Sequence, residues 1–262
     1  MVTMEQTALS TDQRSFYQEN GYLLVQGLLS RAEAAAYRQE CHDLARRLSA
    51  NASLESTWKS AREVAPGQGD TMLLGCHNVQ FYAAAFSRLI VDERLTGIAA
   101  GLIDSPNVQL HHTKMFIKPP EKGSPFPLHQ DYPFFPHERH SMIAAIVHFD
   151  DAPVEKGCVC VAPGSHKLGP LDHEPEGSWH LPLDRYPLES AITCPARAGD
   201  VLFFSYLTIH GSGVNVSDEA RTTVLVQMRD PLDQPTLKTH QSRGQGMMLR
   251  GIDPAAVLRG VE

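Results

Sequence analysis

A histidine and an aspartate stand two positions apart in the segment at 127–133, which reads Pro-Leu-His-Gln-Asp-Tyr-Pro. If this segment is extended, side chains at positions i and i+2 point to the same face, so His129 and Asp131 can converge on one metal ion. A second histidine, His210, lies far along the chain. Two histidines and one carboxylate make the facial triad that holds non-haem Fe(II) in oxygen-activating sites. The spacing therefore predicts an iron site.

An arginine close to the second histidine adds a candidate anion site. The apolar run at 201–204 leads toward His210, residues with turn chemistry follow at 211–215, and a new apolar strand starts at Arg221. This order predicts a hairpin that brings Arg221 near His210. A guanidinium can bind a carboxylate through two parallel hydrogen bonds, and the hydroxyl of Ser212 can contribute another contact.

Helical signals dominate the N-terminal part of the chain. Capping boxes of the type Ser-x-x-Gln and Ser-x-x-Glu begin at Ser10 and Ser30. Residues 50–70 lack periodicity and predict a loop, either a plain connection or a lid over the site. The other expected elements are a helix after Ser10, a strand at 22–25, an amphipathic helix at 31–49 and a helical stretch at 81–103 that breaks near Val91.

The apolar period changes from 3.6 to 2 after residue 107, which indicates strands. The expected strands are 108–118, 142–149, 158–162, 191–194, 200–205 and 221–229, separated by long loops at 119–141 and 163–190, with a short helix near 254–258 in the tail. Many short strands after N-terminal helices predict a mainly β jelly roll with the helices packed outside. We expect one domain over 1–262, with its β core at about 107–230.

Composition limits the partners and the compartment. The net charge is −7 and basic runs are absent, which argues against nucleic acid or an anionic membrane as a partner. The five cysteines are scattered without a CxxC pair, so we expect reduced thiols and a cytoplasmic location. No apolar run in the sequence approaches the roughly 18 residues that span a bilayer. We expect a monomer or a weak homo-oligomer.

Several motifs in order resemble the phytanoyl-CoA dioxygenase family of Fe(II)- and 2-oxoglutarate-dependent oxygenases. The resemblance covers about residues 10–230. It depends on His129-Gln130-Asp131, the run from Gly157 to Lys167, Gly199-Asp200-Val201, His210-Gly211-Ser212-Gly213 with Asn215 and Arg221, and the opening at 19–30.

The resemblance implies a double-stranded β-helix that uses Fe(II), 2-oxoglutarate and O2. It assigns the iron to His129, Asp131 and His210. It assigns the distal carboxylate of 2-oxoglutarate to Arg221 with help from Ser212, and a further polar contact to either His112 or Lys114 on the preceding strand. Some relatives have a tryptophan where Ile146 stands here. A carboxylate at Asp131 favours an oxygenase, because halogenases of this type have a small residue at that position.

The substrate expected from the resemblance is a small molecule, and we favour tailoring of a natural product or other specialised metabolite. Hydroxylation is the default outcome, with cyclisation, epimerisation and desaturation as related oxidations of a C–H bond. An acyl-CoA 2-hydroxylase is the alternative within the class. A non-enzymatic jelly-roll binding module and a cupin with another metal are alternatives outside it.

Candidate substrate residues lie in the loop after the iron motif. Tyr132, Phe134 and His137 are expected either to line the substrate pocket or to belong to the core and its loops. Residues 179–180 are a further candidate for a loop that covers substrate. Cys158 and Cys160 alternate with valines and are expected to share one face of a strand rather than to bind a metal.

Overall fold

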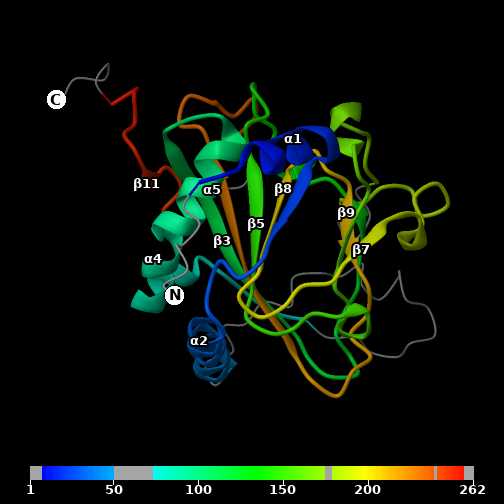
Figure 1. The fold of residues 1–262 in the computed structure, drawn as a ribbon. Coiled ribbons are helices and arrows are strands. Elements are labelled where there is room, and N and C mark those ends of the chain that lie inside the picture. The colour runs from blue at the N-terminus through cyan, green and yellow to red at the C-terminus, as the bar shows by residue number, and fades with distance from the viewer. Residues whose placement is uncertain (1–7, 50–72, 175–178, 239–240, 257–262) are drawn as a thin grey trace.

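Two antiparallel sheets face each other, and helices cover the outer face of the larger sheet (Figure 1). The computed structural model describes residues 8–49, 73–174, 179–238 and 241–256. The predicted loop or lid at 50–70 lies outside these ranges. Among the helices of the described residues, none is long and apolar enough to cross a membrane.

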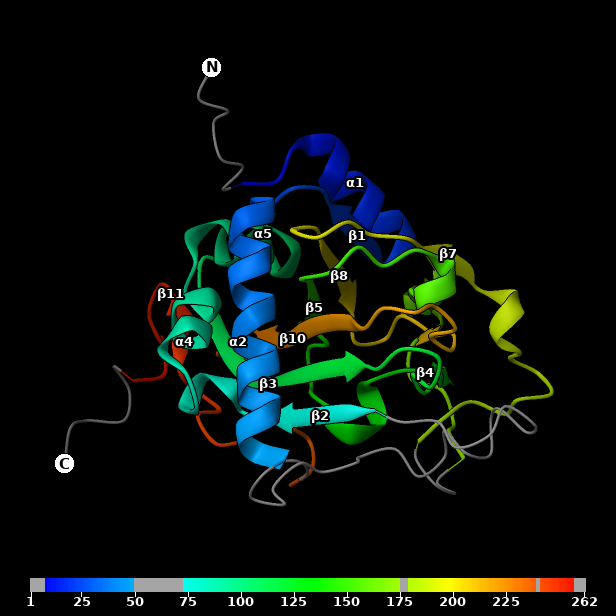
Figure 2. The same ribbon diagram turned by 90° about the horizontal axis from the view of Figure 1, so that it is seen from below.

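The larger sheet has the strand order β1-β8-β5-β10-β3-β11, and β2 also pairs with β3. Two long strands, β3 and β10, form its centre, and the prediction of their bounds is confirmed (Figure 2). The strands are β1 (Tyr22–Val25), β2 (Leu74–His77), β3 (Val108–Lys118), β5 (Ile143–His148), β8 (Val201–Ser205), β10 (Arg221–Arg229) and β11 (Met248–Arg250).

The smaller sheet has the order β4-β9-β6-β7. Its strands are short: β4 (Phe126–His129), β6 (Val159–Val161), β7 (Ile192–Cys194) and β9 (His210–Ser212). The predicted hairpin between His210 and Arg221 is wrong, because β9 pairs with β4 and β6 whereas β10 pairs with β3 and β5. The chain crosses from one sheet to the other between these residues, so they approach each other across the interior.

Within the described residues, four α-helices precede the β core, and the prediction that helices pack outside it is confirmed. They are α1 (Thr11–Asn20), α2 (Arg31–Ser49), α4 (Ala84–Ile90) and α5 (Glu93–Ile103). The predicted helical stretch at 81–103 breaks near Val91 as expected, but it starts with a 3-10 turn, η1 (Val79–Phe81). Both predicted capping boxes are present at Ser10 and Ser30.

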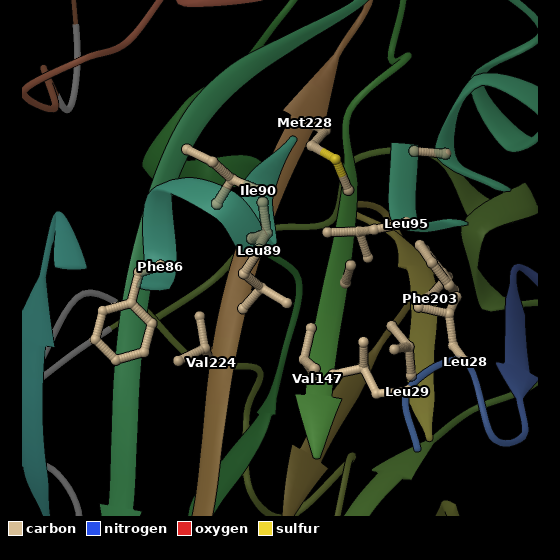
Figure 3. Packing of buried hydrophobic residues seen from close by; sticks show 14 of the residues in the cluster. Leu28, Leu29, Phe86, Leu89, Ile90, Leu95, Val147, Phe203, Val224 and Met228 are labelled. Atoms are coloured by element: carbon tan, nitrogen blue, oxygen red, sulfur yellow. The ribbon is translucent and has the colours of Figure 1, made fainter. Parts of the chain in front are cut away.

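Alternation along the central strands separates two cores. On β10, Val224, Val226 and Met228 point toward the helices, where Figure 3 shows Leu89 of α4 and other apolar residues gathered over the sheet. The opposite face of the larger sheet packs against the smaller sheet through a second cluster: Ala144, Ile146, Val159, Val161, Cys194, Leu202, Phe204 and Leu225. The helices thus stabilise one face, and the other face is left for an interior cavity.

Several local predictions differ from the structure. Two short strands, β4 and β11, lie where the sequence predicted a loop and a weakly patterned tail, and a third, β2, lies at residues for which no element was predicted. Pairing with β3 or β9 forms them, because short segments without strong alternation depend on a neighbouring strand for their hydrogen bonds. The predicted helix at 254–258 is a turn as far as residue 256, and its remaining residues are not described.

Candidate active site

The three predicted metal ligands lie together at one edge of the smaller sheet. His129 ends β4 and stands opposite His210, the first residue of β9, in the strand pairing. The Nε2 atoms of these histidines lie 3.8 and 3.7 Å from Oδ1 of Asp131. Three ligand atoms, one from each residue, lie within 4.8 Å of one another. This separation fits a single metal ion at their centre.

Asp131 reaches this point by a route that the sequence did not predict. The strand stops at His129, and Asp131 has φ −75° and ψ −19° at the start of the 3-10 helix η2 (Tyr132–Phe134). The expectation of an extended pair at i and i+2 is therefore wrong in its geometry. The turn directs the carboxylate back toward both imidazoles.

Each histidine is oriented through its second ring nitrogen. Nδ1 of His129 lies 2.8 Å from the carbonyl oxygen of Pro127, and Nδ1 of His210 lies 3.0 Å from that of Thr208. A carbonyl only accepts, so Nδ1 carries the proton and Nε2 keeps a free lone pair. This is the tautomer that a metal ligand needs.

Burial keeps both imidazoles uncharged. It lowers the pKa of His129 to about 3, with a further contribution from the neighbouring His210, and it lowers the pKa of His210 to about 4. Burial also raises the pKa of Asp131 to about 6, so this carboxyl group is still mainly ionised at pH 7. Two neutral imidazoles and one carboxylate are the donor set that suits Fe(II).

Gln130, between the two ligands, points away from the metal site and anchors the motif. Its fully buried amide donates to the carbonyl oxygens of Gly169 and Leu207 and accepts from the backbone N–H of Leu171. Its own backbone N–H donates to Nε2 of His173. These bonds tie the iron motif to two loops.

A cavity of about 350 Å³ opens beside the three ligands. Several aromatic rings, among them Phe116 and Phe126, and three aliphatic side chains line it. Ile146 is one of these aliphatic residues. His112 and Lys114 both reach the cavity from β3.

Arg221 lies at the end of the cavity that Ser212 also lines. It is buried, its Nη1 donates to the carbonyl oxygen of Gly157, and burial lowers its pKa to about 10. Its Nε atom has no hydrogen-bond partner in the described part of the chain, and neither has Oγ1 of Thr223 on the same face of β10. Buried hydrogen-bond donors without a partner, next to a positive charge, are suited to binding an anion.

A second buried cation, which the sequence interpretation did not include in the site, stands directly opposite Arg221. Lys118 pairs with Arg221 in the register of β3 and β10 and is fully buried. Its Nζ donates to Oγ of Ser212 (2.7 Å) and to the carbonyl oxygen of Gly213 (2.6 Å). Burial and the charge of Arg221 lower the pKa of the lysine. Like charges opposite each other are unfavourable without an anion.

The predicted substrate residues divide into two groups. Phe134 lines the cavity, as does its neighbour Phe135. Tyr132 instead packs against Tyr206, with ring centroids 5.7 Å apart, and neither it nor His137 lines the cavity that the described residues form. His137 is buried, and its Nδ1 bonds to the carbonyl oxygen of Phe135.

The remaining candidates are two cysteines next to or within β6 and the pair at 179–180. Cys158 and Cys160 flank Val159 of β6, and the Sγ atom of Cys160 bonds to the carbonyl oxygen of Cys158. All five cysteines are free and buried. His180 is buried and pairs with Glu174, whereas Trp179 is partly exposed. None of these residues lines the cavity among the parts of the chain described.

The facial triad inside a jelly roll, with buried cations beyond it, places the chain among the non-haem Fe(II) oxygenases. The model of the phytanoyl-CoA dioxygenase (PhyH) family matches residues 17–223. The chain belongs to this family of Fe(II)- and 2-oxoglutarate-dependent dioxygenases, which confirms the resemblance, the fold class, the iron and the co-substrate.

Named relatives agree with this assignment. The peroxisomal phytanoyl-CoA dioxygenase of Bos taurus is 29% identical over 244 residues, which cover 87% of this chain and 71% of the relative. The crystal structure of the carbocyclase SnoK from nogalamycin biosynthesis is 24% identical, with a TM-score of 0.74 over 94% of this chain and 96% of that one. The epimerase SnoN, crystallised with Fe3+, α-ketoglutarate and nogalamycin RO, is 25% identical, with a TM-score of 0.70 over 92% and 96%.

Proposed function

We propose that this enzyme oxidises a C–H bond of a small specialised metabolite, by hydroxylation or by a related cyclisation, epimerisation or desaturation. The observation that supports it most directly is the apolar cavity of about 350 Å³ next to the converged His129, Asp131 and His210. Bound Fe(II) would use 2-oxoglutarate and O2 to generate the oxidant. The protein residues hold the iron, orient the co-substrate and exclude water.

Within this proposal the distal carboxylate of 2-oxoglutarate binds Arg221, and the Ser212 hydroxyl contributes a hydrogen bond. Lys118 supports that contact, because its Nζ already donates to Oγ of Ser212. The hydroxyl hydrogen of Ser212 is then free to point toward the anion. His112 and Lys114 both line the cavity, so both stay candidates for a further polar contact. Of the three residues predicted to contact the substrate, Phe134 is the one that lines the cavity.

The preference for a specialised metabolite rests on likeness. The carbocyclase and the epimerase from nogalamycin biosynthesis have the same fold over more than nine-tenths of this chain. An acyl-CoA substrate is the second candidate, because the bovine phytanoyl-CoA dioxygenase is 29% identical. The cations that line or adjoin the cavity, Lys114, Lys118 and Arg221, are buried, whereas coenzyme A phosphates would need cations at an accessible mouth. This favours the smaller substrate.

The proposed chemistry is tested by anaerobic titration of the apoprotein with Fe(II) and 2-oxoglutarate. We expect a metal-to-ligand charge-transfer band, and we expect it to disappear in Asp131→Ala and Arg221→Ala. Lys122→Met, at an exposed position, is the control and should keep the band. Absence of both the band and succinate release in the wild-type enzyme would contradict the proposal.

The substrate class is tested by succinate release in air across two panels, one of small polycyclic and amino-acid-derived metabolites and one of acyl-CoA thioesters. Stimulation by the first panel alone supports the proposal. Stimulation by thioesters, lost when coenzyme A is removed from the acyl group, would assign the enzyme to acyl-CoA oxidation instead.

The expected monomeric or weakly oligomeric state and the cytoplasmic location stay predictions, as does a single domain over 1–262.

A further inference from the structure

The inner face of β10 contributes to both ends of the cavity. Alternate residues of this strand, Arg221, Thr223, Leu225 and Gln227, all line it. Arg221 lies at the anion end, and Gln227 lies beside the metal ligands. Gln227 is fully buried, and its Nε2 donates to Oδ2 of Asp131 at 2.6 Å.

This contact makes the two oxygens of Asp131 unequal. Oδ1 lies 3.8 and 3.7 Å from the Nε2 atoms of His129 and His210, so it faces the metal position. Oδ2 is held by the amide of Gln227. An ionised carboxylate only accepts hydrogen bonds, so the amide must present its nitrogen to Asp131. The other end of the amide, Oε1, has no hydrogen-bond partner among the residues described.

A neutral amide suits this position better than a charged side chain would. A lysine or an arginine at the same distance would neutralise Asp131 and weaken its attraction for a divalent cation. The amide of Gln227 fixes the direction of the carboxylate and leaves its charge available. To bind a metal through both oxygens, Asp131 would have to break a short hydrogen bond inside a buried site, which is unfavourable because hydrogen bonds to charged groups are stronger than those between neutral groups.

We propose that Gln227 is a positioning residue that limits Asp131 to one metal–oxygen bond. The protein then supplies three ligand atoms, and the remaining coordination positions stay available to 2-oxoglutarate and to a small diatomic ligand. This inference depends on the iron site and the co-substrate of the proposed function. It adds a residue that acts on the metal through Asp131.

The test uses the full-length protein with Fe(II), 2-oxoglutarate and nitric oxide, which probes an open iron position by electron paramagnetic resonance. Gln227→Leu keeps a similar volume and removes the donor, whereas Gln227→His retains an N–H donor. We expect Gln227→Leu to keep the charge-transfer band of 2-oxoglutarate. We also expect its affinity for nitric oxide to fall at least 10-fold, because removing a residue that supports a metal ligand typically costs about 10–100-fold. Gln227→His should restore nitric oxide binding.

Val226→Ala is the matched control, because Val226 is the neighbouring residue of β10, is fully buried and faces the helices. It should lower thermal stability without changing either spectrum. The inference is overturned if Gln227→Leu binds nitric oxide like the wild-type enzyme, or if it loses Fe(II) and the charge-transfer band together. A wild-type enzyme without the band would instead refute the iron and co-substrate assignment itself, so the two failures are distinguishable.

Discussion

At the residue scale, two residues hold the site together, although neither is a metal ligand or the arginine predicted to bind the anion. Lys118 and Gln130 are both fully buried and polar, and each makes hydrogen bonds that connect separate segments. Lys118 connects β3 to the residues after β9, whereas Gln130 connects the iron motif to the loops near Gly169 and Leu207. Their contributions should differ, because only Lys118 carries a charge next to Arg221.

Lys118→Met removes one cation from the anion end while it keeps most of the side-chain volume. We expect the affinity for 2-oxoglutarate to fall roughly 10-fold, because the Ser212 hydroxyl loses the donor that directs its hydrogen toward the anion, and a hydrogen bond to a charged group contributes about 1.5–3 kcal/mol. The measurement is the charge-transfer titration under anaerobic conditions. Lys122→Met, at an exposed position in the following loop, is the control. An affinity within about 2-fold of wild type would show that Lys118 acts only in packing.

Gln130→Leu should destabilise the fold by at least about 3 kcal/mol, because it leaves two carbonyl oxygens and one backbone N–H without their partner, at about 1–3 kcal/mol for each unsatisfied group. Urea denaturation followed by circular dichroism measures this loss. The exposed Gln26→Leu serves as the control and should change the free energy of unfolding little. Equal stability of Gln130→Leu and wild type would contradict the anchoring function.

At the scale of elements, helix termini and strand connections place the site. The N-terminus of α2 is fixed by Ser30 and Glu33, and Glu33 also accepts from Arg94 of α5. The connection from β5 to β6 approaches the residues that follow β9 so closely that a glycine is required at Gly157. Each feature leads to a separate experiment.

The pH dependence of stability should include a contribution from Glu33. The hydrogen bond from Arg94, with help from Ser30, lowers the pKa of Glu33 from 4.5 to about 2. A lowered pKa in the folded state stabilises the protein above the unfolded value of 4.5, and this stabilisation is lost as the pH falls toward 2. The difference in unfolding free energy between wild type and Glu33→Gln should therefore be constant near neutral pH and shrink in acid. Its size should be small, because the side chain is 40% exposed.

Gly157→Ala should impair the anion end of the cavity. Gly157 has a φ of +64°, and an added Cβ would lie 2.3 Å from the carbonyl oxygen of Gly213, the group that accepts from Lys118. Gly27→Ala is the control, since its φ is +62° but nothing lies within 4 Å of the added atom. Both variants should lose about 1–2 kcal/mol through the left-handed backbone. Only Gly157→Ala should bind 2-oxoglutarate more weakly, and equal affinities would contradict the role of this close approach.

At the scale of the whole molecule, the proposed co-substrate would bridge the two sheets. The histidine ligands belong to the smaller sheet, whereas Arg221 and Lys118 belong to the larger one. A ligand that binds only the folded state, by contacting both sheets, stabilises the fold by mass action. The free energy of unfolding rises by about 2.7 kcal/mol when the free ligand concentration is 100 times the dissociation constant. The metal and 2-oxoglutarate are thus expected to stabilise the protein in two steps.

Thermal unfolding with Mn(II), a redox-stable substitute for Fe(II), measures these steps. Metal alone should raise the melting temperature, and metal with 2-oxoglutarate should raise it by several more degrees, at roughly 2–4 °C per kcal/mol. Asp131→Ala should abolish both increments, whereas Arg221→Ala should abolish mainly the second. A second increment of full size in Arg221→Ala would contradict the proposed bridge, and chelation of the metal should reverse both increments in the wild type.

The sequence alone determined the identity of the metal ligands and the class of fold. His129, Asp131 and His210 could be selected because metal chemistry restricts the residue types strictly, and the strands at 108–118 and 221–229 could be placed because alternation depends only on neighbouring residues. The capping boxes at Ser10 and Ser30 are equally local signals. Such features are encoded within a few residues of the chain.

The tertiary structure decided how these parts meet. The register of β3 against β10 places Lys118 opposite Arg221, and the crossing between sheets replaces the hairpin expected between His210 and Arg221. Gln227 reads in the sequence as a polar residue near the end of a strand, and only the fold brings it to Asp131. Pairing between distant strands has no local code, because it depends on hydrogen bonds and packing that form after the whole chain has come together.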